Sequence, residues 1–270
     1  MPIIIILFVA FFVAVLACGH EAIAKGLLEF TEMATRFIGA ALLLTFGIVA
    51  LFWSVELLKH SHTRPIVRTE TAFIIAYLLG SIPFGLLLTK FAGLGDIRKV
   101  GSGNIGATNV LRTGNRELAG LTLMLDMLKG VVAVVLAETI HPWLGPVAAL
   151  VAMLGHMYPV WLAFKGGKGV ATAIGVISAL SWPIGLAVIT LWLLVAWLFG
   201  YSSLAAIISI GFSPLFAYLL KRPDLIWMTV AAVFLIVFRH RDNIERLIEG
   251  KEPKIGKEKT TTRKRRKNGD

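Results

Sequence analysis

Charged residues are scarce in this sequence, and those present are mostly basic. Only 16% of the 270 residues are Asp, Glu, Lys or Arg, whereas 57% are hydrophobic and the mean hydropathy is +0.79. So little charge cannot cover a water-facing surface, which excludes an ordinary soluble domain. The apolar residues form runs of about 16 to 22, the length at which a helix crosses a bilayer. The sequence therefore predicts an all-α integral membrane protein.

Cysteine is nearly absent, and no carboxylate cluster accompanies the polar segments described below. The single thiol, Cys18, excludes an intramolecular disulfide and a metal site built on cysteine. His20, His60 and His62 have no carboxylate at ligand spacing, so we expect solvated loop residues rather than metal ligands. Met1–Ile6 holds no Lys or Arg, so the charged start of a signal peptide is missing. We expect neither a metal nor another cofactor.

Hydrophobic runs divide the chain into an extension, a core and a tail. Residues 1–70 hold about two extra hydrophobic helices, Ile3–Ala17 and Phe37–Leu58, and have no assigned role. Residues 71–250 form a core of seven expected transmembrane helices. Residues 251–270 are rich in Lys and Arg, and we expect them to form a basic, disordered tail. The seven expected spans are Thr71–Phe91, Leu118–Ala137, Trp143–Trp161, Val170–Leu180, Ile184–Phe199, Ser203–Leu219 and Leu225–Phe238.

Three polar segments, here called the first, second and third islands, interrupt the core. They are Gly101–Gly114 (GSGNIGATNVLRTG), Gly155–Thr172 (GHMYPVWLAFKGGKGVAT) and Arg239–Leu247 (RHRDNIERL). The glycine-rich first island cannot cross lipid, because it has no helical pattern to satisfy its own N–H and C=O groups. At a membrane edge, exposed amides, hydroxyls and guanidinium groups suit an anion. We therefore predict that the three islands form one phosphate-handling site.

The positions of the islands also predict the topology. The first island follows span one, Lys165–Gly169 follows span three and the third island follows span seven, so all lie on one face. Lys and Arg concentrate on that face, and the positive-inside rule makes it cytoplasmic, together with the C-terminus. The basic tail suits contact with anionic lipid. No aromatic or folded motif accompanies it, so we do not expect nucleic-acid binding.

The second island contains a candidate phosphate cradle at Phe164–Gly169. Its glycines allow close approach of an oxyanion, Lys168 adds a charge, and a helix is predicted to begin at Val170. Lys168 is followed by Gly169 rather than by Ser or Thr, so the segment is not a Walker A loop and nucleotide hydrolysis is disfavoured. The alternative is a tight turn at the membrane surface with snorkelling lysines.

The first island and the second span supply further candidates. Ser102 and the pair Asn104 and Asn109 can donate to phosphate or carbonyl oxygens, and Arg112 can clamp a phosphate bidentately. The alternative is a loop whose polar side chains only cap helices. Asp126 and Lys129 share one face of a helix, so we expect them to pair, with Lys129 able to reach the site.

Two histidines of the core have different expected roles. His240 lies between Arg239 and Arg241, and these cations disfavour its imidazolium form, which leaves a neutral ring for one hydrogen bond. His156 lies in an apolar run, and we expect it to bond a backbone carbonyl.

Together these segments resemble the bacterial acyl-phosphate:glycerol-3-phosphate acyltransferase (PlsY) family. The resemblance covers about residues 71–252 and is carried by the first and second islands, Ser81–Gly85 (SIPFG), Asp126–Gly130 and RHRDNIERLIEGKE at the end of the core. The extension and the tail depart from the family pattern and inherit no role. A transporter is the competing class, but it would place polar breaks near the middle of the membrane rather than at helix exits.

The resemblance implies a seven-helix enzyme of the bacterial inner membrane with its active site on the cytoplasmic face. It would move a fatty acyl group from a long-chain acyl phosphate to the 1-hydroxyl of sn-glycerol 3-phosphate. The products are lysophosphatidic acid and phosphate, in the first step of phospholipid synthesis, downstream of an enzyme that forms acyl phosphate. Because acyl phosphate is a mixed anhydride with a good leaving group, no acyl-enzyme intermediate is required.

The family motifs also imply roles for individual residues. Phosphate would be held by Arg112, Lys168 and the amides of Gly166–Gly169, and a substrate phosphate oxygen could act as base. A covalent acyl-Ser102 is the rival mechanism. The implied catalytic set is Ser102, Arg112, Lys168, Ser203, His240 and Asn243, and the implied phosphate-binding set is Gly103, Asn104, Gly166, Gly167 and Gly169.

Overall fold

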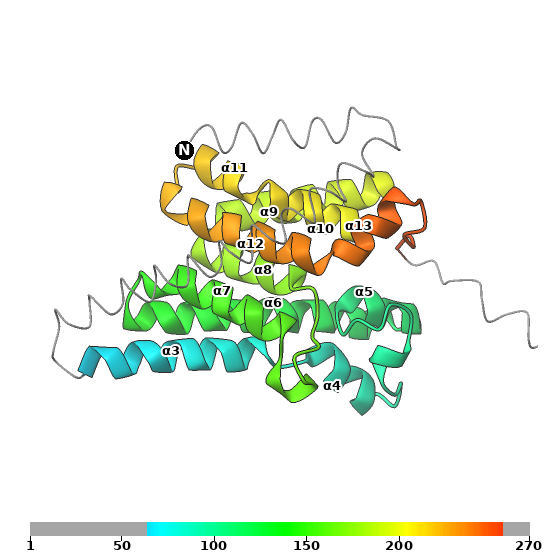
Figure 1. Ribbon diagram of the computed structural model, residues 1–270, viewed down its shortest axis with the longest axis horizontal. Coiled ribbons are helices and arrows are strands. Elements are labelled where there is room, and N and C mark those ends of the chain that lie inside the picture. The colour runs from blue at the N-terminus through cyan, green and yellow to red at the C-terminus, as the bar shows by residue number, and fades with distance from the viewer. Residues whose placement is uncertain (1–63, 256–270) are drawn as a thin grey trace, which may run out of the picture. The chain divides into compact units, whose positions relative to one another are not determined.

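The computed structural model describes residues 64–255, and all the regular secondary structure in that range is helical. The expected helices at Ile3–Ala17 and Phe37–Leu58, the histidines at positions 20, 60 and 62, and residues 256–270 lie outside the described range. Figure 1 shows the arrangement of the described helices. Their order is α3 (Arg64–Gly80), α4 (Phe84–Phe91), η1 (Ile97–Lys99), α5 (Ala107–Val110), η2 (Leu111–Thr113), α6 (Arg116–Ile140), α7 (Leu144–Met157), η3 (Val160–Leu162), α8 (Val170–Leu180), α9 (Trp182–Phe199), α10 (Ser202–Gly211), α11 (Ser213–Leu219), η4 (Pro223–Leu225), α12 (Ile226–Arg239) and α13 (Arg241–Ile248).

Most expected spans agree closely with the observed helices, but the first one is broken. The expected helix Thr71–Phe91 is divided into α3 and α4, which meet at an angle of 42°. The break falls at Ser81–Pro83, because proline has no N–H to continue the helical hydrogen bonds. A second break separates α12 from α13 by 63° at His240, and the sequence did not predict α13 as a helix.

The described part of the chain contains four helices that are long and apolar enough to cross a membrane. They are Arg116–Ile140, Leu144–Leu162, Trp182–Phe199 and Ser202–Leu219. Counting each bent pair as one span raises the number to six.

Helix α8, expected as a further span, falls short of this length. It has 11 residues, which at about 1.5 Å a residue reach roughly half of the ~30 Å hydrocarbon core. Instead it is packed on all sides, with α6 and α7 on one flank and α9, α10 and α12 on the other (Figure 1). Most of its side chains are buried, so it forms the centre of the helix bundle.

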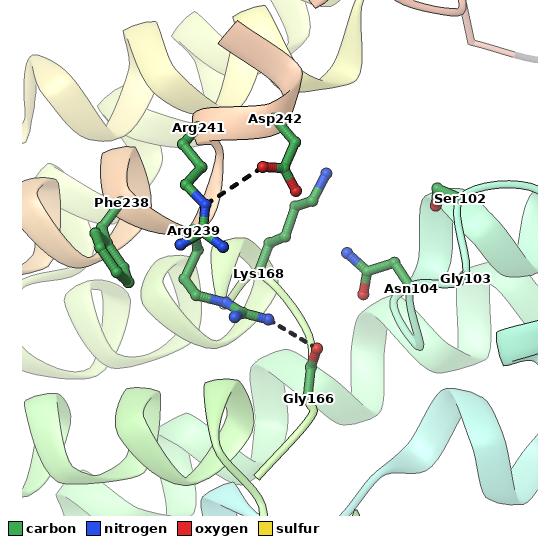
Figure 2. A pocket seen from close by; sticks show the side chains of 9 residues that line it. All are labelled: Ser102, Gly103, Asn104, Gly166, Lys168, Phe238, Arg239, Arg241 and Asp242. Atoms are coloured by element: carbon green, nitrogen blue, oxygen red, sulfur yellow. Dashed lines mark hydrogen bonds and ion pairs between the residues drawn. The ribbon is translucent and has the colours of Figure 1, made fainter. Parts of the chain in front are cut away.

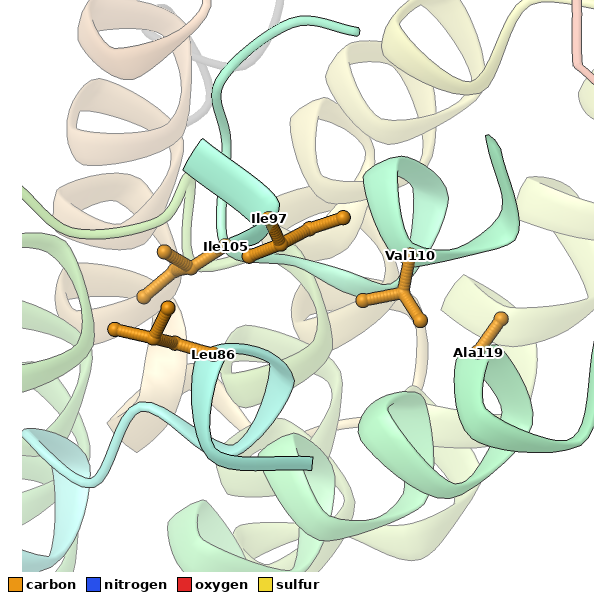
Figure 3. Close-up of a cluster of buried hydrophobic side chains, with 5 residues drawn as sticks. All are labelled: Leu86, Ile97, Ile105, Val110 and Ala119. Atoms are coloured by element: carbon orange, nitrogen blue, oxygen red, sulfur yellow. The ribbon is translucent and has the colours of Figure 1, made fainter. Parts of the chain in front are cut away.

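A small apolar core anchors the first island to the bundle. Leu86 on α4, Ile97 on η1 and Val110 on α5 pack together with Ile105 and Ala119, as Figure 3 shows. All five side chains are nearly inaccessible to solvent. The polar residues of the first island are therefore held at a set place beside the ends of α4 and α6, although the loop between them has little regular structure.

Candidate active site

The three islands meet at one hollow of about 180 Å³. Figure 2 shows residues from distant parts of the sequence facing one another across it. This confirms the predicted convergence of the islands. Three cationic side chains line the hollow against one carboxylate, which suits an anion. The lining residues are Ser102, Gly103, Asn104, Gly166, Lys168, Phe238, Arg239, Arg241 and Asp242.

Asn109 organises the first island instead of facing a ligand. Its side-chain NH₂ donates to the carbonyls of Ile97, Val100 and Asn104 at 2.7–3.0 Å, and its Oδ1 accepts from the Ser102 N–H at 3.1 Å. Of the two expected acceptors for Asn109, carbonyl oxygens are the ones it bonds, and its donors are used within the loop rather than left for phosphate. The loop in turn presents Ser102 and Asn104 at the hollow, where Asn104 faces Lys168 (Figure 2).

Lys168 provides the charge of the second island. Its Nζ donates to Oδ1 of Asn243, which lies on α13. Burial lowers the pKa of Lys168 to about 8, although the nearby Glu252 carboxylate acts in the opposite direction. Lys168 thus sits where a second negative charge, such as a phosphate, would favour its ammonium form.

The glycine amides of the second island are used differently from the prediction. The N–H of Gly166 donates to the Met157 carbonyl at 3.1 Å, and that of Gly167 donates to the His156 carbonyl at 3.0 Å. These two amides are therefore not open to a phosphate. The first N–H groups of α8, beginning at Val170, have no partner within the helix and offer the alternative.

Arg239 belongs to the site, although the sequence analysis did not include it in the catalytic set. Its guanidinium donates to the Gly167 carbonyl at 3.1 Å and to the Gly166 carbonyl at 3.0 Å. It also lies over the Tyr158 ring, 5.2 Å from the centroid. Arg239 thereby offsets the negative ends of two carbonyl dipoles of the second island, which would otherwise repel an anion in the hollow.

Glu252 is the second residue that sequence reasoning missed. Its Oε1 accepts from Ser203 at 2.7 Å and from Asn243 at 2.6 Å, and its Oε2 accepts from Arg246 at 2.8 Å. Burial alone would raise the pKa of Glu252, but these three hydrogen bonds hold it below its usual value. The first residues after the expected core boundary at position 250 therefore pack against the site.

The remaining catalytic candidates lie beside the hollow rather than on its wall. Arg112 lies against Gly101, where a Cβ would be 2.8 Å from its Nη1, and burial lowers its pKa. His240 is buried, and its Nδ1–H donates to the Ile236 carbonyl at 2.8 Å, which leaves Nε2 as an acceptor. Ser203 and Asn243 meet at Glu252, as described above. Gly169, the N-cap residue before α8, has a left-handed conformation.

Asp126 and Lys129 pair within α6 as the sequence predicts, with 2.7 Å between Oδ1 and Nζ. Neither residue lines the hollow. His156 contacts Lys129 Nζ at 2.9 Å instead of a backbone carbonyl, so the expected role of His156 is wrong. Within residues 64–255, His, Cys, Asp and Glu nowhere form a group of three that could hold a metal ion.

Comparisons with known proteins agree with this arrangement. The family model described as glycerol-3-phosphate acyltransferase matches residues 71–250. A glycerol-3-phosphate acyltransferase from Mesorhizobium japonicum is 54% identical over 185 residues, which cover 68% of this chain and 95% of the relative. One from Jannaschia sp. is 51% identical over 202 residues, covering 72% of this chain and 98% of the relative.

Two crystal structures of PlsY (YgiH), an integral membrane glycerol 3-phosphate acyltransferase, have a similar fold. The glycerol 3-phosphate form has a TM-score of 0.67 and 41% identity, over 70% of this chain and 96% of PlsY. The lysophosphatidic acid form has a TM-score of 0.65 and 39% identity, over 69% and 94% of the two chains. The matched family model, the close relatives and the shared fold together show that this chain belongs to the glycerol-3-phosphate acyltransferase family, as an integral membrane protein of the PlsY type.

Proposed function

We propose that this protein transfers a fatty acyl group from acyl phosphate to the 1-hydroxyl of sn-glycerol 3-phosphate. The observation that carries the proposal is the cationic hollow at the meeting point of the three islands, where Lys168, Arg239 and Arg241 face Ser102 and Asn104. Both proposed substrates carry a phosphate, and the hollow offers several separate donors for such groups. The described part of the chain also has four helices apolar enough to cross a membrane, which suits an enzyme whose substrate carries a long acyl chain.

The reaction needs alignment and charge neutralisation more than a protein nucleophile. The 1-hydroxyl oxygen of glycerol 3-phosphate attacks the carbonyl carbon of acyl phosphate, and the new ester C–O bond forms. The bond from that carbon to the phosphate oxygen breaks, and inorganic phosphate leaves with the electron pair. A substrate phosphate oxygen takes the hydroxyl proton. Because phosphate is a good leaving group, we propose direct transfer without an acyl-enzyme intermediate.

The side chains divide between holding phosphate and orienting the reacting groups. We assign phosphate binding to Lys168, Arg112 and the first N–H groups of α8. The amides of Gly166 and Gly167 leave this set, because α7 already accepts from them. Ser102, His240 and Asn243 orient the hydroxyl or the developing oxyanion, with Ser203 and the backbone at Gly103 in support. Ser203, His240 and Asn243 are buried, and burial strengthens the polar contacts that these three side chains make.

We further propose that the hollow faces the cytoplasm of a bacterial cell, at the surface of the inner membrane. On this proposal the short helix α8 counts as the seventh span, and the C-terminus is cytoplasmic. The positive-inside rule supports this orientation, since ten of the thirteen Lys and Arg residues of the core lie in the second and third islands or in the segment 90–116 around the first island. The acyl phosphate then comes from an enzyme that forms it on the same side of the membrane.

The first test uses the purified full-length protein in detergent. Glycerol 3-phosphate is supplied with palmitoyl phosphate or, separately, with palmitoyl-CoA, and lysophosphatidic acid and phosphate are measured. We expect product from the acyl phosphate alone. Arg112→Ala should lower kcat/KM at least about a hundredfold, because a positioned guanidinium contact to phosphate is lost.

Other outcomes would contradict particular parts of the proposal. Product from the thioester alone would retain the acyltransferase and remove the acyl-phosphate donor. No product from either donor, in folded protein, would remove the enzyme assignment. Trapping an acyl group on Ser102 would replace direct transfer with a covalent mechanism.

A further inference from the structure

A buried charged cluster behind the hollow has no part in the mechanism above. It consists of Asp126 and Lys129 on α6 and His156 on α7, whose side chains are 2–4% exposed. Lys129 Nζ lies 2.7 Å from Asp126 Oδ1, 2.9 Å from His156 Nδ1 and 2.8 Å from the Ile82 carbonyl. The ammonium thus makes hydrogen bonds with Ile82 and His156 and an ion pair with Asp126, whose Oδ1 has no hydrogen-bond partner among the described residues. Burying charged side chains costs desolvation free energy, so charged residues at such positions usually have a functional role.

These contacts determine which nitrogen of His156 carries the proton. Nδ1 accepts from the Lys129 ammonium, so the proton of the neutral ring is on Nε2. Nε2 faces the second island at Gly167. A Cβ added at Gly167 would lie 2.0 Å from Nε2, and its three nearest neighbours would all be atoms of the His156 ring. The ring therefore occupies the space that a side chain at position 167 would need.

The main chain ties the same residues together. The His156 carbonyl accepts from the Gly167 N–H, as described above, so both ring and backbone of His156 meet Gly167. On the other side of Lys168, the hydroxyl of Thr172 in the first turn of α8 donates to the Asp126 carbonyl at 3.0 Å. The cluster thus contacts the chain on both sides of Lys168, the residue whose Nζ enters the hollow.

We infer that Asp126, Lys129 and His156 are positioning residues that hold the Gly166–Gly169 segment, and hence Lys168, at the hollow. The Asp126 carboxylate pairs with Lys129, Lys129 orients the His156 ring, and the ring fixes Gly167 from behind. The main-chain carbonyl of Asp126 adds a contact to Thr172 at the start of α8. A directional network of this kind defines one arrangement, whereas an apolar cluster would tolerate sliding of the segment. The expected effect on glycerol 3-phosphate rests on the proposed function, but the placement of the segment does not.

The test combines His156→Ala and Gly167→Ala in a double-mutant cycle. Gly167→Ala is essential because it disturbs the contact without removing a buried charge partner. We expect each single variant to weaken glycerol 3-phosphate binding, measured by calorimetry, at least about tenfold. Removing the ring makes room for the methyl group that Gly167→Ala adds, so the double variant should bind no more weakly than the weaker single variant. Losses that multiply in the double variant would overturn the inference.

Amide hydrogen exchange provides a readout that does not depend on catalysis. In His156→Ala, in Gly167→Ala and in Lys129→Met, we expect faster exchange at Gly166 and Gly167, with α9 still protected. Ser178→Ala is the matched control, because it removes another buried polar atom from α8 far from Lys168, and it should change neither exchange nor binding. Unchanged exchange at Gly166 and Gly167 in the first two variants would overturn the inference. The two proposals can fail separately. If the unmutated protein makes no product but exchange at Gly166 and Gly167 still becomes faster in these variants, the proposed function is wrong and the positioning role is supported.

Discussion

Lys168 illustrates how a single residue can be tuned by what surrounds it. The sequence shows only a lysine in a glycine-rich run. In the structure its Nζ lies at the wall of a hollow, bonded to Asn243, with Glu252 one hydrogen bond further away. Burial lowers its pKa to about 8, so its charge depends on pH within the range in which enzymes are assayed.

This pKa leads to a prediction for pH dependence. In the proposed mechanism Lys168 binds phosphate through its ammonium form, and the protonated fraction of Lys168 falls as pH rises through a pKa of about 8. Glycerol 3-phosphate itself stays a dianion above about pH 7. Between pH 7 and pH 9 we therefore expect affinity for glycerol 3-phosphate to fall about tenfold, as measured by calorimetry.

Lys168→Arg is the matched variant, because a guanidinium stays charged throughout this range. Its affinity should be nearly independent of pH from 7 to 9, whatever its absolute value. An equally steep decline in Lys168→Arg would show that another group is responsible for the pH dependence.

At the scale of helices, the first island depends on how α4 meets the loop around Ile105. A Cβ at Gly85 would lie 1.9 Å from the Ile105 carbonyl oxygen and 3.0 Å from Thr122 on α6. The backbone of the loop thus rests directly on α4, and the apolar core of Figure 3 closes around this contact. The position of Ser102 and Asn104 at the hollow follows from it.

We expect Gly85→Ala to push the first island away from α4. Since the obstructing atom belongs to the backbone, the cost should be about 1–3 kcal/mol in unfolding free energy, seen as a lower Tm in detergent. Affinity for glycerol 3-phosphate should fall as well.

Gly120→Ala is the control, because nothing lies within 4 Å of its added Cβ. That variant should be about 0.5–1 kcal/mol more stable, as alanine favours the helix. Equal effects of the two variants would show that the Gly85 contact does not position the island.

At the scale of the whole molecule, the chain places its polar chemistry at one end of an apolar bundle. Exposed tryptophan, leucine and phenylalanine side chains lie on α9, and exposed leucine, methionine, valine and isoleucine side chains lie on α6, as expected for surfaces that face lipid. The cations of the hollow come from loops and helix ends, where water and phosphate can reach them.

Thiol labelling can test the proposed cytoplasmic orientation. With Cys18→Ala as background, Lys251→Cys and Lys221→Cys each introduce one exposed thiol. On the proposed topology, a membrane-impermeant maleimide labels Lys221→Cys in intact spheroplasts but labels Lys251→Cys only after lysis. The reverse pattern would place the hollow outside the cytoplasm.

Local sequence was sufficient for the class of fold and for the polar segments that carry the chemistry. Hydrophobic runs indicate membrane helices because the backbone N–H and C=O groups of a helix bond to each other within the same segment. Predicting such a helix therefore needs no information about distant residues. The start of α8 at Val170 and the pair of Asp126 with Lys129 were predictable for the same reason, since they depend on neighbours in sequence.

The tertiary structure decided which of the polar groups remain available. The amides of Gly166 and Gly167 and the side chain of Asn109 resemble ligand donors in the sequence, but they are already bonded within the protein. Glu252 resembles part of a basic tail, yet its carboxylate joins Ser203 and Asn243. The reason is physical: a hydrogen-bonding group is defined by its partner, and these partners are set by how distant segments pack rather than by spacing along the chain.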